Sequence, residues 1–315
     1  MQNSQNPPFP PILGMSLGVL AASTAALFIR FAQQDAPSLV IAAYRLTLAT
    51  LIIIPYALIR ERSAFKGLTR QQMGLGLLSG VFLAAHFATW ISSLAFTSVA
   101  SSAVLVSTAP LFVALLSTLL LREPLQRKVL VGLAIAMAGS ILIGLSDACQ
   151  WQSGLTCPAL HEFFRGQSVQ GDLLALAGAC AGAFYMIVGR RARGDVALIP
   201  YITLTYGAAA LVLLLLVLIS GHPIFGYPLR AYGWFALLAL IPQLIAHSTI
   251  NWALRYLTAA LVAIILLAEP VGSSALAFFL LDETPGALLI LGGILSLAGI
   301  GIASRKPSQN PSQRL

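Results

Sequence analysis

Polar side chains recur at four-residue spacing inside otherwise apolar stretches of this sequence. His86 and Trp90 lie four residues apart, and Gln243, His247 and Asn251 repeat that spacing in a later stretch. Residues four apart lie on one face of a helix, so each set would form a polar stripe. Two interpretations remain open. The stripes line a wet cavity that binds a small polar ligand, or they only join helices through hydrogen bonds.

Two ionisable residues lie well inside apolar stretches. Arg45 follows the start of one such stretch by a few turns, and Glu269 lies in the middle of another. A charge at the centre of a membrane helix costs roughly 2.5–3.5 kcal/mol on insertion scales. Arg45 could contact a ligand, or it could pair structurally or extend to the membrane surface. Glu269 could titrate or pair with a cation, or it could satisfy backbone groups freed by Pro270.

The sequence does not favour enzyme chemistry. It contains no His-Glu-x-x-His pair, no serine motif of the Gly-x-Ser-Gly type in an apolar stretch and no Gly-x-x-x-x-Gly-Lys-Ser/Thr phosphate loop. His86, His247 and Glu269 could gather as metal ligands, but they lie on separate predicted helices, so this signal is weak. We therefore predict no enzymatic activity, no catalytic residues, no metal and no other cofactor.

The composition indicates how these residues are positioned. Of 315 residues, 58% are hydrophobic and 9% are charged, against roughly 45–50% and 25% in soluble domains. Apolar runs close to the roughly 20 residues that cross a bilayer recur along the chain. We expect an all-α integral membrane protein with ten transmembrane helices, near residues 12–32, 37–58, 73–96, 102–121, 129–145, 171–189, 196–220, 232–254, 258–281 and 286–303.

The basic residues predict the orientation of these helices. The formal charge of +8 would suggest nucleic acid as a partner of a soluble protein, but here most of the 18 Lys and Arg residues fall in alternate loops. With those loops cytoplasmic, both termini are cytoplasmic as well. The first apolar segment has no basic region before it and no clear cleavage site, so we interpret it as a retained helix.

The second half of the chain repeats the first. At one constant offset, Pro110 falls on Pro270 and Glu123 falls on Glu283. Each half holds five predicted spans, an odd number, so the second half must enter the membrane from the opposite side. The fold class is therefore predicted as two inverted five-helix repeats. Prolines at corresponding mid-span positions indicate interrupted helices and a binding site near the midplane.

Small residues predict where helices approach closely. Gly14 with Gly18, and Gly178 with Gly182, are spaced by four residues in equivalent helices of the two halves. The fifth and tenth spans are rich in glycine and poor in polar groups, so we expect them to be packing elements. The expected divisions are a disordered tail (1–11), the first repeat (12–145), an extracytoplasmic linker loop (146–170), the second repeat (171–304) and a cytoplasmic tail (305–315).

Three cysteines decide little. Cys149 and Cys157 fall in the predicted extracytoplasmic loop, where a disulfide and two free thiols both remain open. Cys180 falls in an apolar helix and is interpreted as a small packing residue.

Several stretches together resemble the drug/metabolite transporter superfamily, and specifically its EamA-type ten-helix exporters. The stretches that carry the resemblance are Ala42-Ala43-Tyr44-Arg45-Leu46, Trp90 to Pro110 with Leu121-Arg122-Glu123, Gly171-Asp172, Asn251-Trp252-Ala253-Leu254, Glu269-Pro270 and Glu283. The resemblance implies a central cavity lined by helices of both halves, and export of amino acids or other metabolites from the cytoplasm through a bacterial inner membrane. The long linker loop is a departure from the usual short linker.

We therefore expect a secondary transporter that exports small metabolites, with aromatic or other neutral amino acids as the leading substrates. Nucleosides and organic cations are alternative substrates, and an intramembrane enzyme is far less favoured. The expected partners are the small-molecule substrate and membrane lipid but not nucleic acid, and a homodimer stays open. The candidate substrate-binding residues are Tyr44, Arg45, His86, Trp90, Tyr185, Tyr206, Gln243, His247, Asn251, Trp252 and Glu269.

Overall fold

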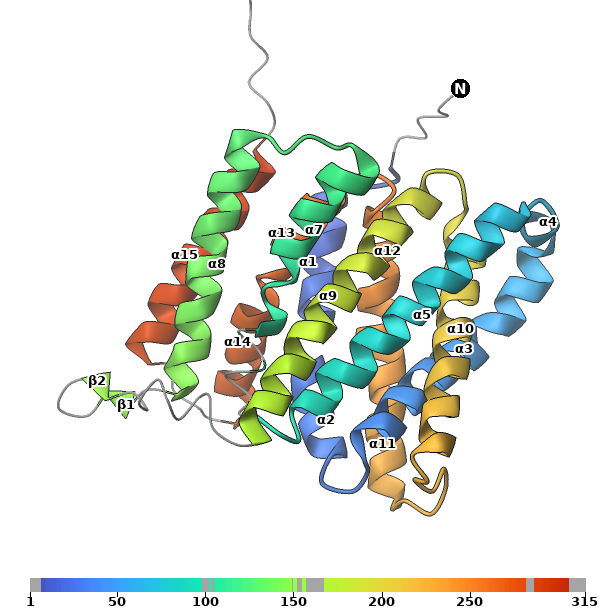
Figure 1. Ribbon diagram of the computed structural model, residues 1–315, viewed down its shortest axis with the longest axis horizontal. Helices are drawn as coiled ribbons and strands as arrows, with labels where there is room; N and C mark the ends of the chain where they lie inside the picture. The colour runs from blue at the N-terminus through green and yellow to red at the C-terminus, as the bar shows by residue number, and fades with distance from the viewer. Residues whose placement is uncertain are drawn as a thin grey trace, which may run out of the picture.

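The structure is a computed structural model, and it describes residues 7–97, 102, 105–148, 150–151, 155–156, 167–281 and 286–305. Helices account for nearly all of these residues (Figure 1). The strands β1 (Gln150–Trp151) and β2 (Leu155–Thr156) form one short antiparallel pair. Cys149 and Cys157 lie outside the described residues.

The helices of the first half are α1 (Pro11–Ala22), α2 (Ala25–Ala32), α3 (Ser38–Arg60), α4 (Arg62–Lys66), α5 (Arg70–Ser93), α7 (Ala109–Leu116), the π-helical η1 (Ser117–Leu121) and α8 (Arg127–Ala148). Those of the second half are α9 (Gln167–Arg193), α10 (Leu198–Ile219), α11 (Leu229–Leu238), the π-helical η2 (Ala239–His247), α12 (Ser248–Ala253), α13 (Ala259–Leu266), α14 (Glu269–Leu281) and α15 (Ala287–Ser304).

Within the described residues, eight helical segments are long and apolar enough to cross a membrane, so the protein is a multi-pass membrane protein. Consecutive helices join in several of these segments, as α1 with α2 and α11 with η2 and α12. A shorter apolar helical segment covers Ala109–Leu121. The eight segments are Pro11–Ala32, Ser38–Arg60, Arg70–Ser93, Val169–Arg193, Leu198–Ile219, Leu229–Ala253, Ala259–Leu276 and Ala287–Ser304.

Helices α8 and α15 pack side by side at one end of the bundle (Figure 1). Glycines allow this approach, because a Cβ atom added at Gly139 would lie 2.5 Å from the carbonyl oxygen of Gly292. Gly132 and Gly299 face each other in the same way, with 2.6 Å between the added Cβ atom and the opposite carbonyl oxygen. The fifth and tenth predicted spans therefore pack closely against each other, as their composition indicates.

Helices α5 and α9 cross closely in the middle of the bundle. A Cβ atom added at Gly182 would lie 2.9 Å from Nδ1 of His86, and one added at Gly178 would lie 3.2 Å from Cβ of Trp90. The small residues of α9 therefore leave room for the two large polar rings of α5. The predicted role of these glycines in close packing is confirmed, and the packing fixes where the rings lie.

A membrane-embedded cavity as candidate binding site

The helices around the centre of the bundle are interrupted at specific points. The first span breaks between α1 and α2 at Ser23 and Thr24, and a corresponding turn separates α13 from α14. Pro270 is the second residue of α14, and Pro110 is the second residue of α7. Proline is well tolerated there, because the first N–H groups of a helix have no intrahelical acceptor. Helix starts in mid-span follow directly from these two prolines.

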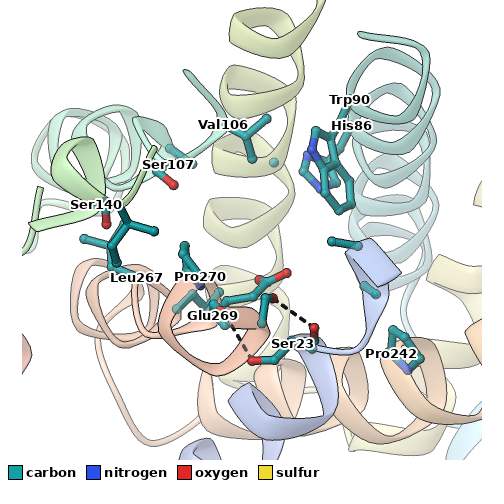
Figure 2. A pocket seen from close by; sticks show the side chains of 18 of the residues that line it. Ser23, His86, Trp90, Val106, Ser107, Ser140, Pro242, Leu267, Glu269 and Pro270 are labelled. Carbon is teal, nitrogen blue, oxygen red and sulfur yellow. Dashed lines mark hydrogen bonds between the residues drawn. The ribbon is translucent and has the colours of Figure 1, made fainter. Parts of the chain in front are cut away.

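Two of the interruptions contact each other. The Ser23 hydroxyl donates to the backbone carbonyl of Glu269 at 3.1 Å, and the Ser273 hydroxyl donates to the backbone carbonyl of Ser23 at 2.9 Å (Figure 2). Gly272 lies directly against Ser23 Oγ, so a Cβ atom at position 272 would collide with it. The break in the first span is thus joined to the start of α14 through side-chain to backbone hydrogen bonds.

A cavity of about 640 Å³ lies beside these interruptions. Its volume falls within the roughly 300–1,000 Å³ of small-molecule sites. The start of α14, the turn before α7 and the face of α5 that carries His86 and Trp90 surround it (Figure 2). Of the residues predicted from sequence, those that line the cavity are Arg45, His86, Trp90, Tyr185, His247 and Glu269.

Arg45 is the most deeply buried charge at the cavity. Its side chain is 1% exposed, and Nε donates to Oε1 of Gln243 at 2.8 Å. The guanidinium carbon lies 4.1 Å from the ring centroid of Phe87, a cation–π contact. This burial excludes extension of Arg45 to the membrane surface, one of the alternatives that the sequence leaves open. Nη1 is buried and has no hydrogen-bond partner among the described residues.

The polar stripe of α5 faces the cavity as a stacked pair of rings. The His86 and Trp90 ring centroids are 5.7 Å apart, and the two planes differ by 21°. His86 Nδ1 lies 2.8 Å from the carbonyl oxygen of Gly178. Because a carbonyl oxygen only accepts hydrogen bonds, this contact assigns the proton to Nδ1. The imidazole is therefore anchored to α9 by one nitrogen, while its other nitrogen is available as an acceptor.

A hydrogen-bonded network supports the cavity wall from behind. The Tyr185 hydroxyl donates to Oδ1 of Asn251 at 2.9 Å, and Nδ2 of Asn251 donates to the Tyr206 hydroxyl at 3.5 Å. The Tyr206 and Ser248 hydroxyls are hydrogen-bonded at 3.1 Å. Asn251 and Tyr206 are fully buried and do not line the cavity. The network fixes Tyr185, the member that lines the cavity.

The second stripe does not present one face to the cavity. His247 lines it, whereas Gln243 faces Arg45 and Asn251 faces Tyr185. Residues 239–247 form the π-helix η2, which contains Pro242. In a π-helix the hydrogen bond spans five residues, so the four-residue step from Gln243 to His247 no longer completes a turn. Asn251 follows in the α-helix α12.

Two predicted aromatic residues lie away from the cavity. The Tyr44 hydroxyl donates to the carbonyl oxygen of Ile224 at 2.9 Å, and its ring stacks on Phe235 at 4.7 Å. Trp252 stacks on Phe9 at 4.5 Å. Phe9 belongs to the segment expected to be a tail, yet it packs against the bundle. Both rings pack against other parts of the bundle and do not line the cavity.

Several cavity residues were not among the sequence candidates. Ser23, Gln33 and Ser140 add hydroxyl and amide groups to the lining. The only sequence signal for Ser23 is the adjacent pair Ser23-Thr24 in the middle of an apolar run. That signal is weak, because serine and threonine in membrane helices commonly bond to the preceding turn. Ser23 shares its single hydroxyl hydrogen between that acceptor, the carbonyl oxygen of Val19 at 2.8 Å, and the carbonyl oxygen of Glu269 at 3.1 Å.

The cavity extends toward one end of the bundle. Its lining includes Gln33 and Leu94, and a second hollow of about 470 Å³ shares these two residues. At the opposite end of α9, Arg190 forms an ion pair with Glu123 at 2.9 Å. Its Nη1 also donates to the carbonyl oxygen of Leu254 at 2.8 Å. Among the residues that the structure describes, none at this ion-paired end lines the cavity, and the described lining leads toward the opposite, accessible end.

The arrangement suits binding of a small molecule with polar and apolar parts. Aromatic rings and aliphatic side chains form most of the wall, and a few charged or hydrogen-bonding groups converge on the same space. Among the described residues, no group of three or more His, Cys, Asp or Glu side chains could hold a metal ion.

The comparisons with known proteins agree with this geometry. Residues 9–145 and residues 169–305 each match the family model described as the EamA-like transporter family. An uncharacterized transporter of Archaeoglobus fulgidus is 24% identical over 94% of this chain and 97% of its own length. The pseudopaline exporter CntI of Pseudomonas aeruginosa is 26% identical over 93% of this chain and 96% of its own length. A solved structure with 21% identity superposes with a TM-score of 0.75 over 93% of this chain and 96% of its own, and so shares the fold.

Proposed function

The chain belongs to the EamA-like transporter family, and we propose that it is a secondary transporter of small metabolites that works by alternating access. The observation that carries this proposal is the cavity of about 640 Å³ beside interrupted helices, with Arg45 and Glu269 in its lining. Charged groups in membrane-spanning segments are costly and mark substrate pathways. Helix interruptions in mid-membrane place backbone and side-chain polar groups where a substrate binds.

Ten spans in two inverted repeats are part of this proposal. The apolar segment Ala109–Leu121 and helix α8 would add two spans to the eight segments described above and bring the number to ten. The order of elements supports the repeat, because α7 with its proline corresponds to α14, and α8 corresponds to α15, its packing partner. An inverted repeat would let the two halves exchange conformations, so that the cavity faces each side of the membrane in turn.

The direction that we propose is export across a bacterial inner membrane with both termini in the cytoplasm. The basic residues Arg190, Arg191 and Arg193 cluster at one end of α9, and basic clusters favour the cytoplasmic side. The ion-paired end would then be cytoplasmic and the accessible end extracytoplasmic. The relative whose printed name is pseudopaline exporter supports outward transport.

Amino acids with aromatic or other neutral side chains are the proposed substrates. Trp90 and Tyr185 offer aromatic surface to an apolar side chain, while the charged groups of the cavity offer partners to polar groups. Nucleosides and organic cations are the alternatives, since they also combine a flat or apolar part with polar groups.

Counterflow into liposomes tests the proposal. Vesicles with the purified protein are loaded with one unlabelled amino acid at a time, and uptake of the labelled compound is compared with protein-free vesicles. Accumulation establishes transport, and the ranking of substrates shows the side-chain preference. Absence of counterflow for all amino acids by folded protein would refute the amino-acid assignment, and nucleosides and organic cations would follow. Ligand binding without flux of any compound would refute transport itself.

A matched pair of variants links flux to the cavity. Trp90→Ala removes an aromatic ring from the wall and is expected to reduce counterflow strongly while the protein still folds. Phe279→Ala removes a ring that is 76% exposed on the outer surface, and it should leave counterflow unchanged. Equal counterflow in both variants would remove Trp90 from the site.

A further inference from the structure

We propose that the cavity selects a zwitterion: Arg45 and His247 bind the carboxylate of the substrate, and Glu269 binds its ammonium group. This inference rests on the proposed function, because it names the chemical class that the cavity takes. It excludes simple cations, simple anions and uncharged molecules as preferred substrates.

The part of the cavity wall formed by Arg45 and His247 has hydrogen-bonding groups that the described residues do not engage. Arg45 Nη1 and His247 Nδ1 are buried atoms without a hydrogen-bond partner among the described residues, and both residues line the cavity. Buried polar groups without partners are rare and costly, so a site that keeps them is built for an absent partner. A carboxylate is the natural partner of a guanidinium group, because two parallel N–H groups match its two oxygens.

The guanidinium of Arg45 is held in place before any ligand binds. Gln243 accepts the Nε hydrogen at 2.8 Å, and the ring of Phe87 lies 4.1 Å from the guanidinium carbon. The side chain therefore has little freedom left to lose when it binds an anion. Gln243 is a positioning residue, since it does not line the cavity and acts through Arg45.

Glu269 supplies the negative charge that complements Arg45, and it does so from a different helix. It is the first residue of α14, and its side chain extends into the cavity (Figure 2). The hydrogen bond at this residue goes to its backbone carbonyl, and no described residue bonds its carboxylate. A cationic group of a ligand would meet an acceptor that the protein has not already engaged.

Arg45 and Glu269 face one cavity but do not pair with each other. The ion pairs formed among the described residues are Glu123 with Arg190 and Asp35 with Arg230. Opposite charges that face one cavity without contact are satisfied best by a molecule that carries both complementary charges. A ligand with only one charge would leave the other residue unmatched.

Equilibrium binding to the purified protein tests this inference separately from transport. The probes are L-phenylalanine, L-leucine and L-serine, each with its carboxamide, which lacks the carboxylate, and its N-acetyl form, which lacks the ammonium group. For at least one amino acid, both analogues should bind about tenfold more weakly or worse, since each loses a charge-assisted hydrogen bond.

The variants assign each charge to its residue. Arg45→Gln should abolish the preference for the amino acid over its carboxamide but keep the preference over the N-acetyl form. Glu269→Gln should do the reverse. Arg230→Gln is the matched control for the arginine, because the Arg230 side chain is 68% exposed. Glu61→Gln is the control for the glutamate, because Glu61 lies at the end of α3, outside the cavity. Both controls should keep both preferences.

Some outcomes would overturn the inference. If Arg45 has a purely structural role, Arg45→Gln would weaken the binding of all three forms by the same factor and leave the preference for the amino acid over its carboxamide unchanged, which would overturn the inference. Binding of a nucleoside or an organic cation in preference to every zwitterion would overturn the inference and leave the transporter assignment intact. Zwitterion binding with the expected selectivity but no flux would leave the site intact and refute the transport function.

Discussion

The hydrogen bond between Gln243 and Arg45 gives the sharpest test of how this interior is held together. Gln243→Leu removes the acceptor of the Arg45 Nε hydrogen, a contact of 2.8 Å between side chains that are 0% and 1% exposed. No other described residue accepts a hydrogen bond from this guanidinium group. The change therefore leaves a buried cation with its ring contact to Phe87 but without a hydrogen bond.

The magnitude follows from that local loss. A hydrogen bond to a charged group contributes about 1.5–3 kcal/mol to stability. Gln243→Leu should therefore lower the free energy of unfolding by about 1.5–3 kcal/mol. Replacing a buried polar pair by apolar residues of similar size is often neutral or stabilising, because no charge remains to be desolvated. Adding Arg45→Met to Gln243→Leu should therefore recover at least about 1 kcal/mol of that loss.

The assay is equilibrium unfolding of the ligand-free protein in mixed micelles, followed by circular dichroism, for the wild type, both single variants and the double variant. The deciding result is whether adding Arg45→Met to Gln243→Leu raises or lowers the free energy of unfolding. If Arg45→Met lowers the stability of the Gln243→Leu protein further, the guanidinium contributes through packing alone. The argument from an unpaired buried charge would then be refuted.

Further predictions concern helix packing, the ion-paired end of the bundle and the hydrogen-bonded network behind the cavity wall. Gly139→Ala should destabilise the protein by about 1–3 kcal/mol through overpacking against α15. Gly301→Ala, where an added Cβ atom has nothing within 4 Å, should be neutral or stabilising in the same equilibrium unfolding assay. Glu123→Gln and Arg190→Gln should each lower the free energy of unfolding by about 1 kcal/mol. Their double-mutant cycle should show a favourable coupling. Additive losses would mean that the ion pair of 2.9 Å contributes nothing to stability. Tyr185→Phe removes the donor of a buried 2.9 Å hydrogen bond and should cost about 1 kcal/mol in unfolding free energy, and unchanged stability would show that the network does not support the wall.

The sequence predicts well those features that depend on composition and spacing. Apolar runs locate the membrane-spanning helices, and the glycines of α8, α9 and α15 predict close packing, because a missing side chain allows close approach in any context. The prolines at positions 110 and 270 predict interrupted helices, because proline disrupts backbone hydrogen bonding wherever it falls inside a helix.

The direction in which polar side chains point is less predictable from the sequence. The spacing of Gln243, His247 and Asn251 assumes an α-helical turn, and the π-helix η2 changes that turn. Whether a sequence forms a π-helix depends on how its neighbours pack, which single-residue spacing does not contain. The burial of Arg45 depends similarly on Phe87 and on a glutamine far away in the chain.

Contacts between distant segments could not be predicted at all. The hydroxyl of Ser23 is indistinguishable in sequence from any serine that bonds to its own helix, and only the fold brings it to the start of α14. The stacking of Phe9 on Trp252 has the same origin, because the short segment before α1 has no periodicity of its own.

The junction between Ser23 and the start of α14 also constrains how this sequence can diverge. Position 272 has no room for a side chain while position 23 carries a hydroxyl, and the hydroxyl bridges to the neighbouring turn. A larger residue at one position therefore becomes acceptable only when the other becomes smaller. Among homologues that keep this junction, we expect the two positions to covary. Where position 23 is glycine, position 272 should be serine or alanine.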